Sequence, residues 1–331
     1  MRVASLVVLS SLFVALWSSG WIISRFAIDT LSAMTLLSAR YIIMFLVILF
    51  LVTVLGHWRR VGRSTLVCHL LIGVLSHAAY LLAGVGAFEM GVSAGLVAFI
   101  TALQPMLTAV LSGSITGEKT TRIQWQGLLL GLCAVLLLVS DGYQNGLTSY
   151  SLFLPLVAVV SLSIGSLLYK RHELVRRRRR AKPLPVTFIL LIQSAGALTI
   201  LLPVGINNNM VHFNFTNTQW LVVLWLALIV SLGAYALLLI LLRHLPSMQV
   251  ASLGYLVPPV TMVQAYLVFG DRFGWMDIAG LCIAAVGVYL VIRPATQTDR
   301  VPTINTGHNA MRLSRPLDID SKRQRRERPR S

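Results

Sequence analysis

The chain has 331 residues, of which 56% are hydrophobic and only 12% are charged. A water-soluble protein of this length needs far more polar surface, so the composition excludes an ordinary soluble domain and indicates helices that cross a membrane. The formal net charge of +17 suggests a nucleic-acid partner, but the basic residues lie at the ends of apolar runs and in one tail. We expect no nucleic-acid binding, because no basic face is interleaved with aromatic residues.

Apolar runs of about 20 residues predict an all-α integral membrane protein with ten transmembrane helices. The predicted helices cover residues 4–24, 34–55, 66–88, 93–115, 123–140, 150–169, 186–205, 219–241, 247–269 and 275–292. An alternative for the first run is a signal peptide, since Arg2 precedes it. The run continues without a typical small-x-small cleavage site, which favours a membrane helix.

The first and third predicted helices carry aromatic residues. Trp17 and Trp21 share one face of the first helix, and Tyr80 lies in the third. Aromatic surface beside neutral hydrogen-bonding groups suits a partly apolar organic substrate, so we predict that these residues line a substrate cavity. The alternative is ordinary packing between helices.

Two charged residues lie near predicted outer ends of the early helices. Arg40 lies about two turns into the second helix, and we expect its side chain to reach out to the membrane surface. Glu89 closes the third helix. It is the carboxylate that we consider for coupling to protons, and simple solvation is the alternative.

Prolines interrupt the fourth and ninth predicted helices. Pro105 lies midway along the fourth, and Pro258 and Pro259 lie midway along the ninth. Each removes an N–H donor and frees the carbonyl four residues earlier, which then needs a partner in the protein or in a water-filled cavity. We predict helix breaks that act as hinges beside a polar cavity, with a packed kink as the alternative.

Neutral polar residues add to the predicted cavity. They are Thr101 and Gln104 in the fourth helix, Tyr235 in the eighth, and Gln249 and Ser252 in the ninth. Hydrogen bonding between packed helices explains the same residue types equally well, so this alternative stays open for each of them.

The second half of the chain repeats the first at an offset of 153 residues. Residues 104–139 align without gaps on residues 257–292, with eight of 36 positions identical, and Pro105 falls on Pro258. We predict two five-helix repeats, residues 1–145 and 146–294, followed by a tail, 295–331. An odd number of helices in each repeat inverts the second one in the membrane, an architecture that secondary transporters use.

Small residues form a pattern shared by the aligned fifth and tenth helices. They are Gly127 and Gly131 in the fifth helix, and Gly280 and Ala284 in the tenth. Because small residues four apart allow close helix packing, we predict that these two helices pack closely. Their partner is either each other or a second copy of the chain in a homodimer.

Lysines and arginines predict the orientation, because they favour cytoplasmic loops. With Met1 inside, the inner segments hold 25 of the 28, and only Arg25, Arg40 and Arg272 fall outside. We expect both termini in the cytoplasm and location in the cytoplasmic membrane. The basic loop 176–182 and the basic, disordered tail are expected to contact anionic lipid headgroups, with docking of a protein partner as the alternative.

Enzyme and metal motifs are missing from the sequence. It has no GxxxxGK[ST], HExxH, GxSxG or CxxC pattern, and its seven histidines are scattered. We therefore expect no enzyme activity, no cofactor and no metal site.

Several segments resemble the EamA-type members of the drug/metabolite transporter superfamily. "LWSSGWIISRFAI" (16–28) resembles the opening pattern of the family, with Ser18 where that pattern has glycine, and "LLSARYIIMFLVI" (36–48) places Arg40 on the family arginine. Residues 94–139 resemble the helix 4–5 segment with its proline and its Gly-Glu pair. The same pattern recurs at 247–292, where Asp271 replaces the glutamate.

This resemblance implies inverted repeats around a central cavity, lined by helices 1, 3, 4, 6, 8 and 9, and export of a small metabolite. Together with the paired prolines, it leads us to expect a secondary transporter for an amino acid, an amine or a drug-like compound, working by alternating access. The alternative is a membrane scaffold or receptor that uses its basic loop and tail.

Overall fold

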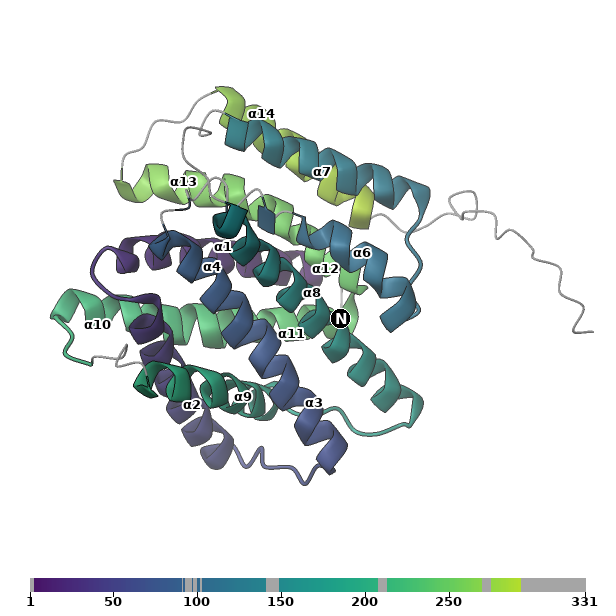
Figure 1. Ribbon diagram of the computed structural model, residues 1–331. Helices are drawn as coiled ribbons and strands as arrows, with labels where there is room; N and C mark the ends of the chain where they lie inside the picture. Colours follow the sequence, from purple (N-terminus) through teal and green to yellow (C-terminus); the bar gives the residue numbers. More distant parts are fainter. Residues whose placement is uncertain are drawn as a thin grey trace, which may run out of the picture.

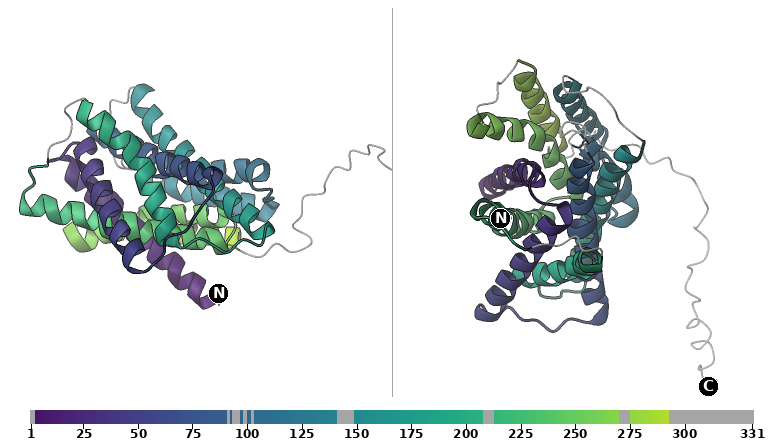
Figure 2. Two further views of the ribbon diagram at one scale, coloured as in Figure 1. Left: turned by 90° about the horizontal axis from the view of Figure 1, so that it is seen from below. Right: turned by 60° about the vertical axis from the view of Figure 1, so that its left-hand side comes forward.

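A computed structural model of the protein describes residues 3–90, 92, 97, 100–101, 103–140, 149–207, 213–269 and 275–292. Within these ranges all regular elements are helices, and they form one bundle, which Figures 1 and 2 show from three sides. The tail 295–331 and the two outer charges Asp271 and Arg272, on which predictions were made, lie outside the described residues.

Helical segments occupy all ten regions in which the sequence predicts them. In the first half they are α1 (Val3–Ile28), α2 (Ala33–Val54), a helix formed by α3 (Arg63–Gly73), η1 (Val74–Ala79) and α4 (Tyr80–Glu89), then α6 (Gln104–Ile115) and α7 (Arg122–Ser140). In the second half they are α8 (Ser149–Arg178), α9 (Val186–Asn207), a helix formed by α10 (Asn217–Leu224), η2 (Trp225–Ala234) and α11 (Tyr235–His244), a helix formed by α12 (Ser247–Ser252), η3 (Leu253–Leu256) and α13 (Val257–Phe269), and α14 (Trp275–Ile292).

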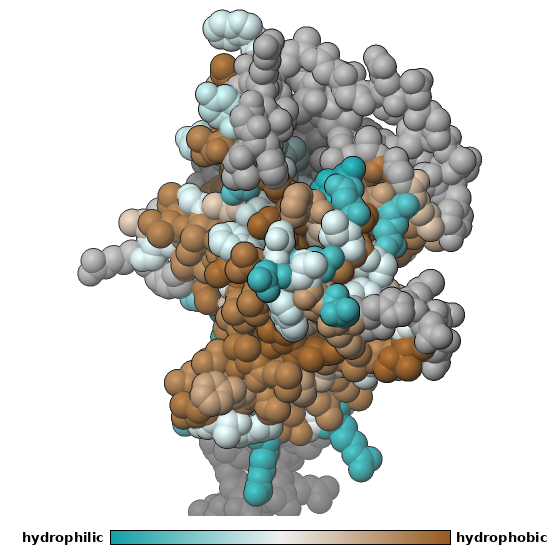
Figure 3. Space-filling view, turned by 90° about the vertical axis from the view of Figure 1, so that its left-hand side faces the viewer, coloured by the Kyte–Doolittle hydropathy of each residue, from teal (hydrophilic) through white to brown (hydrophobic). Residues whose placement is uncertain are grey.

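Large apolar side chains cover the outside of the described bundle. Phe50, Val110 and Leu221 are 65%, 60% and 69% exposed, and Figure 3 shows apolar residues, in brown, over much of one face. Such surface is unusual on a soluble monomer and normal on helices that face lipid. Six of the described helices are long and apolar enough to cross a membrane. The prediction of an all-α membrane protein is thus confirmed.

The Arg-rich segment is partly helical, contrary to the prediction of a loop over 176–182. The sixth helix, predicted to end at residue 169, continues to Arg178, so that Arg176, Arg177 and Arg178 form its last turn. Cations are favourable at this end of a helix, because they face its partial negative charge and its unpaired carbonyls.

Contacts between helices repeat when the two halves of the chain are exchanged. α6 packs on α8 as α13 packs on α1, and α8 packs on η1 as α1 packs on η2. The equivalent pairs α2 with α9 and α7 with α14 pack on each other, and the latter pair lies along the top edge of the bundle in Figure 1. A two-fold relation between two five-helix halves produces this pattern.

Close packing of α7 on α14 uses glycines at the contact. A Cβ atom on Gly127 would lie 2.6 Å from the carbonyl oxygen of Gly287, and one on Gly287 would lie 2.8 Å from that of Gly127. The glycine of α14 that faces Gly127 is thus Gly287, which the sequence pattern did not include. The ring of Tyr255 covers the neighbouring Gly131 so closely that a Cβ atom there would overlap it. Gly127 and Gly131 are thus covered without a second copy of the chain.

The prolines lie in the first turns of α-helical segments, each of which follows an irregular turn. Pro105 lies in the first turn of α6, after an interruption at Leu103, and Pro258 and Pro259 lie in the first turn of α13, after the 3₁₀-helical η3. A proline in the first turn costs no helical hydrogen bond, because the N–H there has no partner within the helix. Both breaks therefore precede the prolines.

π-helical segments interrupt the third and eighth helices, which the sequence did not predict. η1 covers Val74–Ala79, and its positions shifted by the repeat offset, 227–232, fall inside η2. π-helical turns are rare and often lie at functional sites. Their occurrence at equivalent places in both halves directs attention to the residues around them.

Candidate functional site

A pocket lies among α1, α2, α4, η2 and α11. Its lining residues are Trp17, Gly20, Trp21, Ser24, Arg40, Tyr80, Leu81, Val230 and Tyr235. Four of the eight residues predicted to line a cavity thus lie together. The ring of Trp17 is 4.9 Å from that of Tyr235 and 6.0 Å from that of Tyr80, and Trp21 is also 6.0 Å from Tyr80, centroid to centroid. The pocket wall is therefore largely aromatic.

The two π-helical segments hold the polar groups beside this pocket. The Tyr235 hydroxyl donates a hydrogen bond to the Ser76 carbonyl oxygen of η1 at 2.6 Å. The His77 ring, also in η1, stacks on Tyr235 at 4.1 Å and lies 2.9 Å, Nδ1 to hydroxyl, from Tyr41. Ser231 of η2 accepts a hydrogen bond from Arg40. η2 contributes Val230 to the wall, whereas the residues of η1 support Tyr41 and Tyr235 from behind it.

Arg40 points into the protein, so the prediction that it reaches the membrane surface is wrong. Its side chain is buried, with the residue 1% exposed, and its Nε donates to the Ser231 hydroxyl at 2.5 Å. The guanidinium carbon lies 6.0 Å from the centroid of the Tyr41 ring. No carboxylate of the described residues lies within ion-pair distance of it. A buried positive charge therefore borders the aromatic pocket.

Gln249 and Ser252, predicted cavity residues of the ninth helix, make contacts within and between helices instead. The Gln249 amide nitrogen donates to the carbonyl oxygens of Val291 and Ile292 at 3.4 and 3.2 Å, at the end of α14. The Ser252 hydroxyl donates to the Gln249 carbonyl at 2.8 Å. The last carbonyls of a helix lack partners within it, so Gln249 satisfies an end of α14.

Thr101 and Gln104, predicted cavity residues of the fourth helix, also lie away from this pocket. The Thr101 hydroxyl donates to the carbonyl oxygen of Val97 at 2.8 Å. The Gln104 side-chain oxygen lies 3.8 Å from the position of a Cβ atom on Gly254, between the breaks of the fourth and ninth helices. Gln104 therefore belongs to the contact between the two breaks.

Glu89 has a structural partner at the start of α2. Its carboxylate accepts a hydrogen bond from the Ala33 backbone N–H at 2.5 Å. The first N–H groups of a helix have no partner within it, and an anion there is favourable. The contact gives Glu89 the role of holding α2 against the end of α4.

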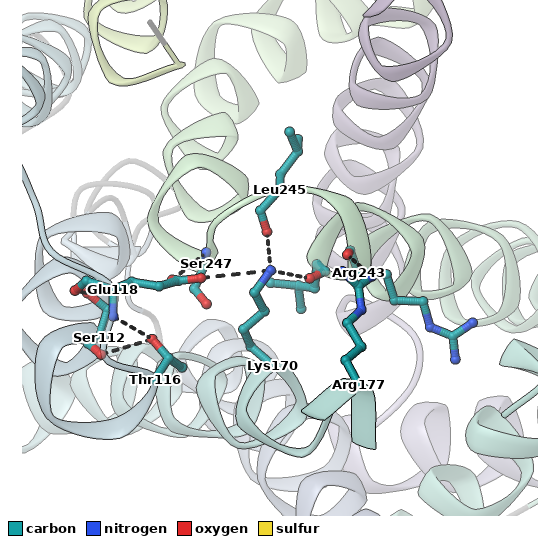
Figure 4. Close-up of polar contacts among 9 residues, drawn as sticks. Ser112, Thr116, Glu118, Lys170, Arg177, Arg243, Leu245 and Ser247 are labelled. Atoms are coloured by element: carbon teal, nitrogen blue, oxygen red, sulfur yellow. Dashed lines mark hydrogen bonds and ion pairs between the residues drawn. The ribbon is translucent and has the colours of Figure 1, made fainter. Parts of the chain in front are cut away.

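A second polar cluster, which we name the Lys170 cluster, comprises Glu118, Lys170, Glu173 and Arg243 near the far ends of α8 and α11. Figure 4 shows Glu118, Lys170 and Arg243 of this cluster. The Lys170 ammonium donates to the carbonyl oxygens of Leu242 and Leu245 at 2.8 and 2.6 Å. It lies 3.8 Å from one oxygen of the Glu118 carboxylate. The other oxygen accepts from the Ser247 N–H at 2.9 Å, at the start of α12.

Arg243 extends the Lys170 cluster across the bundle. Its Nε lies 3.5 Å from the Glu173 carboxylate and donates to the Tyr169 hydroxyl at 2.8 Å. Its Nη2 donates to the Leu184 carbonyl at 2.6 Å, just before α9. The cluster therefore ties the α6–α7 turn of the first half to α8, α9, α11 and α12 of the second. No sequence motif predicts it, since Ser247 is 129 residues from Glu118.

Comparisons with known proteins agree with this architecture. The profile of the EamA-like transporter family matches residues 4–140 and 149–293, once in each half. A probable amino-acid metabolite efflux pump of Escherichia coli (strain K12) is 24% identical over 86% of this chain and 93% of its own. The counterpart in Salmonella typhimurium is 26% identical over 62% of this chain and 69% of its own.

Two further matches concern location and fold. YedA, an uncharacterized inner membrane transporter of Escherichia coli (strain K12), is 24% identical over 83% of this chain and 87% of its own. A crystal structure superposes with a TM-score of 0.69 at 14% identity, covering 87% of this chain and 96% of that one, and so shows the same fold. The helical bundle with its lipid-facing surface and the two family matches together make this protein a multi-pass membrane transporter rather than an enzyme, and a member of the EamA-like transporter family.

Proposed function

We propose that the protein is a secondary transporter that exports a small organic metabolite across the cytoplasmic membrane by alternating access. The observation that carries this proposal is the pairing of an aromatic pocket, built by both halves of the chain, with a separate polar cluster that joins the same halves. The relatives named as amino-acid metabolite efflux pumps support the substrate class and the direction.

The predicted orientation gives the two sites different roles. With Met1 in the cytoplasm, Trp21 and Ser24 lie in the outer half of α1, and Arg40 lies near the outer end of α2. The pocket is then nearer the outside, while the Lys170 cluster lies at the cytoplasmic ends of α8, α11 and α12. In this state the cluster closes the cytoplasmic side, and it has to separate before substrate enters from there.

The helix breaks before Pro105 and Pro258 provide the places where such a movement bends the protein. α12 packs on α6, so the two broken helices lie against each other, and Gln104 faces Gly254 between the breaks. Interrupted helices related by the repeat are a recurrent feature of secondary transporters, although α6, α12 and α13 contribute no lining residue to the aromatic pocket. We assign these prolines to the hinges and Gln104 to their contact.

Flux measurements in proteoliposomes test the proposal. Purified protein is reconstituted, and the movement of radiolabelled amino acids, amines and small aromatic acids is followed against empty liposomes. We expect saturable flux for at least one class, because a transporter exposes a limited number of sites. Flux that rises linearly with concentration indicates a channel, and no flux for any class refutes the proposed function.

A further inference from the structure

We propose that Arg40 is the group that binds the transported molecule, and that this molecule carries a carboxylate or another single negative charge beside an aromatic or apolar body. The inference rests on the proposed function, because it treats the aromatic pocket, which in this conformation has room for about one water molecule, as a transport site that widens when substrate binds. It narrows the substrate from amino acids, amines and drug-like compounds to organic anions.

The charge on Arg40 is not balanced by the protein around it. Arg40 is 1% exposed and lines the pocket. Among the described residues it makes a single hydrogen bond, from Nε to Ser231, and none of their carboxylates pairs with it. Guanidinium has five N–H donors and stays charged, so burying it without an anion is costly. An arginine buried within a membrane span points to a functional site.

The other buried charges of the described chain show what balanced burial looks like here. Lys170 is 6% exposed and has Glu118 and two carbonyl oxygens as partners. Glu173 is 4% exposed and has Arg243. Arg40 lacks the equivalent of either partner, although it is the most buried of these charged groups. Its missing counter-ion is supplied by a ligand in our proposal.

The hydrogen bond to Ser231 uses only Nε of the Arg40 guanidinium, which leaves the two terminal nitrogens for a ligand. With Nε bound to the Ser231 hydroxyl at 2.5 Å, the two terminal nitrogens can bind both oxygens of one carboxylate end-on. Such paired, charge-assisted hydrogen bonds are about twice as strong as neutral ones and favour planar anions. Ser231 is thus a positioning residue for this contact.

The rest of the pocket favours an apolar body and does not offer a site for an ammonium group. Trp17, Trp21 and Tyr80 supply ring surface, and no residue lining the pocket carries a carboxylate. Aromatic rings also attract cations, but the guanidinium beside them opposes a second positive charge. The carboxylate of a ligand should therefore matter more than any amino group.

Binding of three small probes to the full chain in lipid nanodiscs tests this proposal. The probes share a phenylethyl body: 3-phenylpropanoate is an anion, 3-phenylpropanamide is neutral and 2-phenylethylamine is a cation. Isothermal titration calorimetry should give an affinity for the anion at least about tenfold higher than for the other two. If the amide or the amine binds equally well, or if the anion does not bind, the proposal is wrong.

Variants connect the preference to Arg40. Arg40→Gln should abolish the preference for the anion over the amide, and Arg40→Lys should keep part of it, because charge remains without the planar fork. Arg25→Gln is the matched control, since Arg25 is exposed and already paired with Asp29. An anion preference that survives Arg40→Gln contradicts the proposal. If that variant does not fold, the probe comparison on the unaltered protein decides alone.

Flux and binding measurements together distinguish failure of the anion proposal from failure of the proposed function. Saturable flux of amines or neutral compounds, without flux of organic acids, keeps the transporter and overturns the anion proposal. Binding of 3-phenylpropanoate that depends on Arg40, without flux of any compound, supports the anion site and overturns the proposed transport.

Discussion

At the scale of single residues, the aromatic pocket depends on side chains that one face of a helix brings together. Trp17 and Trp21 are four apart and must share a helix face, and they lie in the pocket. Gln249 looked equally suited, yet it satisfies the carbonyl of Val291, 42 residues away. An amide that binds a ligand and one that caps a distant helix look alike in a sequence. The prediction that the Arg40 side chain reaches the membrane surface was wrong, because the direction of a long charged side chain depends on which helices pack around it.

Glu118 allows a test of what holds the Lys170 cluster together. Glu118→Gln keeps an oxygen for the Ser247 N–H but removes the anion beside the buried Lys170 ammonium, so we expect a loss of about 1–3 kcal/mol in unfolding free energy. Glu118→Ala also removes the acceptor at the start of α12 and should cost about 1 kcal/mol more than Glu118→Gln. Denaturant unfolding in detergent measures both. Equal losses in the two variants would show that charge, and not the hydrogen bond, is what matters.

At the scale of elements, the positions of the helices follow from the apolar runs, whereas their irregularities do not. A π-helical turn uses the same residue types as an α-helical turn, and its stability depends on tertiary partners such as the hydrogen bond from Tyr235 to Ser76. The helix breaks were predicted near the prolines, but a proline is also the normal first-turn residue of a new helix. The sequence therefore indicated where the fourth and ninth helices are interrupted, but not which kind of backbone irregularity interrupts them.

The contact of α7 with α14 predicts that a Gly→Ala substitution destabilises the protein at that contact and not elsewhere. Gly127→Ala puts a Cβ atom 2.6 Å from the Gly287 carbonyl oxygen, and we expect a loss of about 1–3 kcal/mol, because backbone cannot move aside as a flexible side chain can. Gly86→Ala is the control, since its Cβ meets nothing within 4 Å. It should be neutral or stabilise by about 0.5–1 kcal/mol. Thermal unfolding measures the stability of the two variants. If Gly127→Ala is as stable as Gly86→Ala, the close packing of α7 on α14 is contradicted.

The proline breaks predict a loss of turnover without a loss of stability. Pro105→Ala combined with Pro258→Ala should leave the unfolding temperature nearly unchanged, since these first-turn positions sacrifice no hydrogen bond. The maximum flux should fall several-fold, because alanine at position 105 allows the fourth helix to continue and alanine at position 258 returns one of the two missing N–H donors to the ninth. Unaltered flux in the double variant rules out the hinge role.

At the scale of the whole molecule, the repeat in the sequence predicted the relation between the halves. Eight identities in 36 aligned positions correspond to helix contacts that remain the same when the halves are exchanged. The Lys170 cluster could not be predicted, because its four charged residues come from three separate elements, the α6–α7 turn, α8 and α11. Chemistry that depends on tertiary contact between the halves is visible only in the fold.

Removal of residues 295–331 separates a transporter from a scaffold. The described helices make up both matched family segments almost completely, so we expect the chain truncated after residue 294 to keep its flux in proteoliposomes. A membrane scaffold or receptor that works through its basic tail should lose its activity. Loss of flux in a truncated protein that is still folded favours the scaffold.

Counterflow tests the central claim, alternating access, most directly. Proteoliposomes are loaded with an unlabelled substrate, and the uptake of a trace of the same labelled substrate is followed from outside. Alternating access predicts that the internal load accelerates uptake and drives a transient accumulation above the external concentration, because the site returns occupied. Uptake that is unaffected by the internal load, and that only approaches equilibrium, would contradict the account.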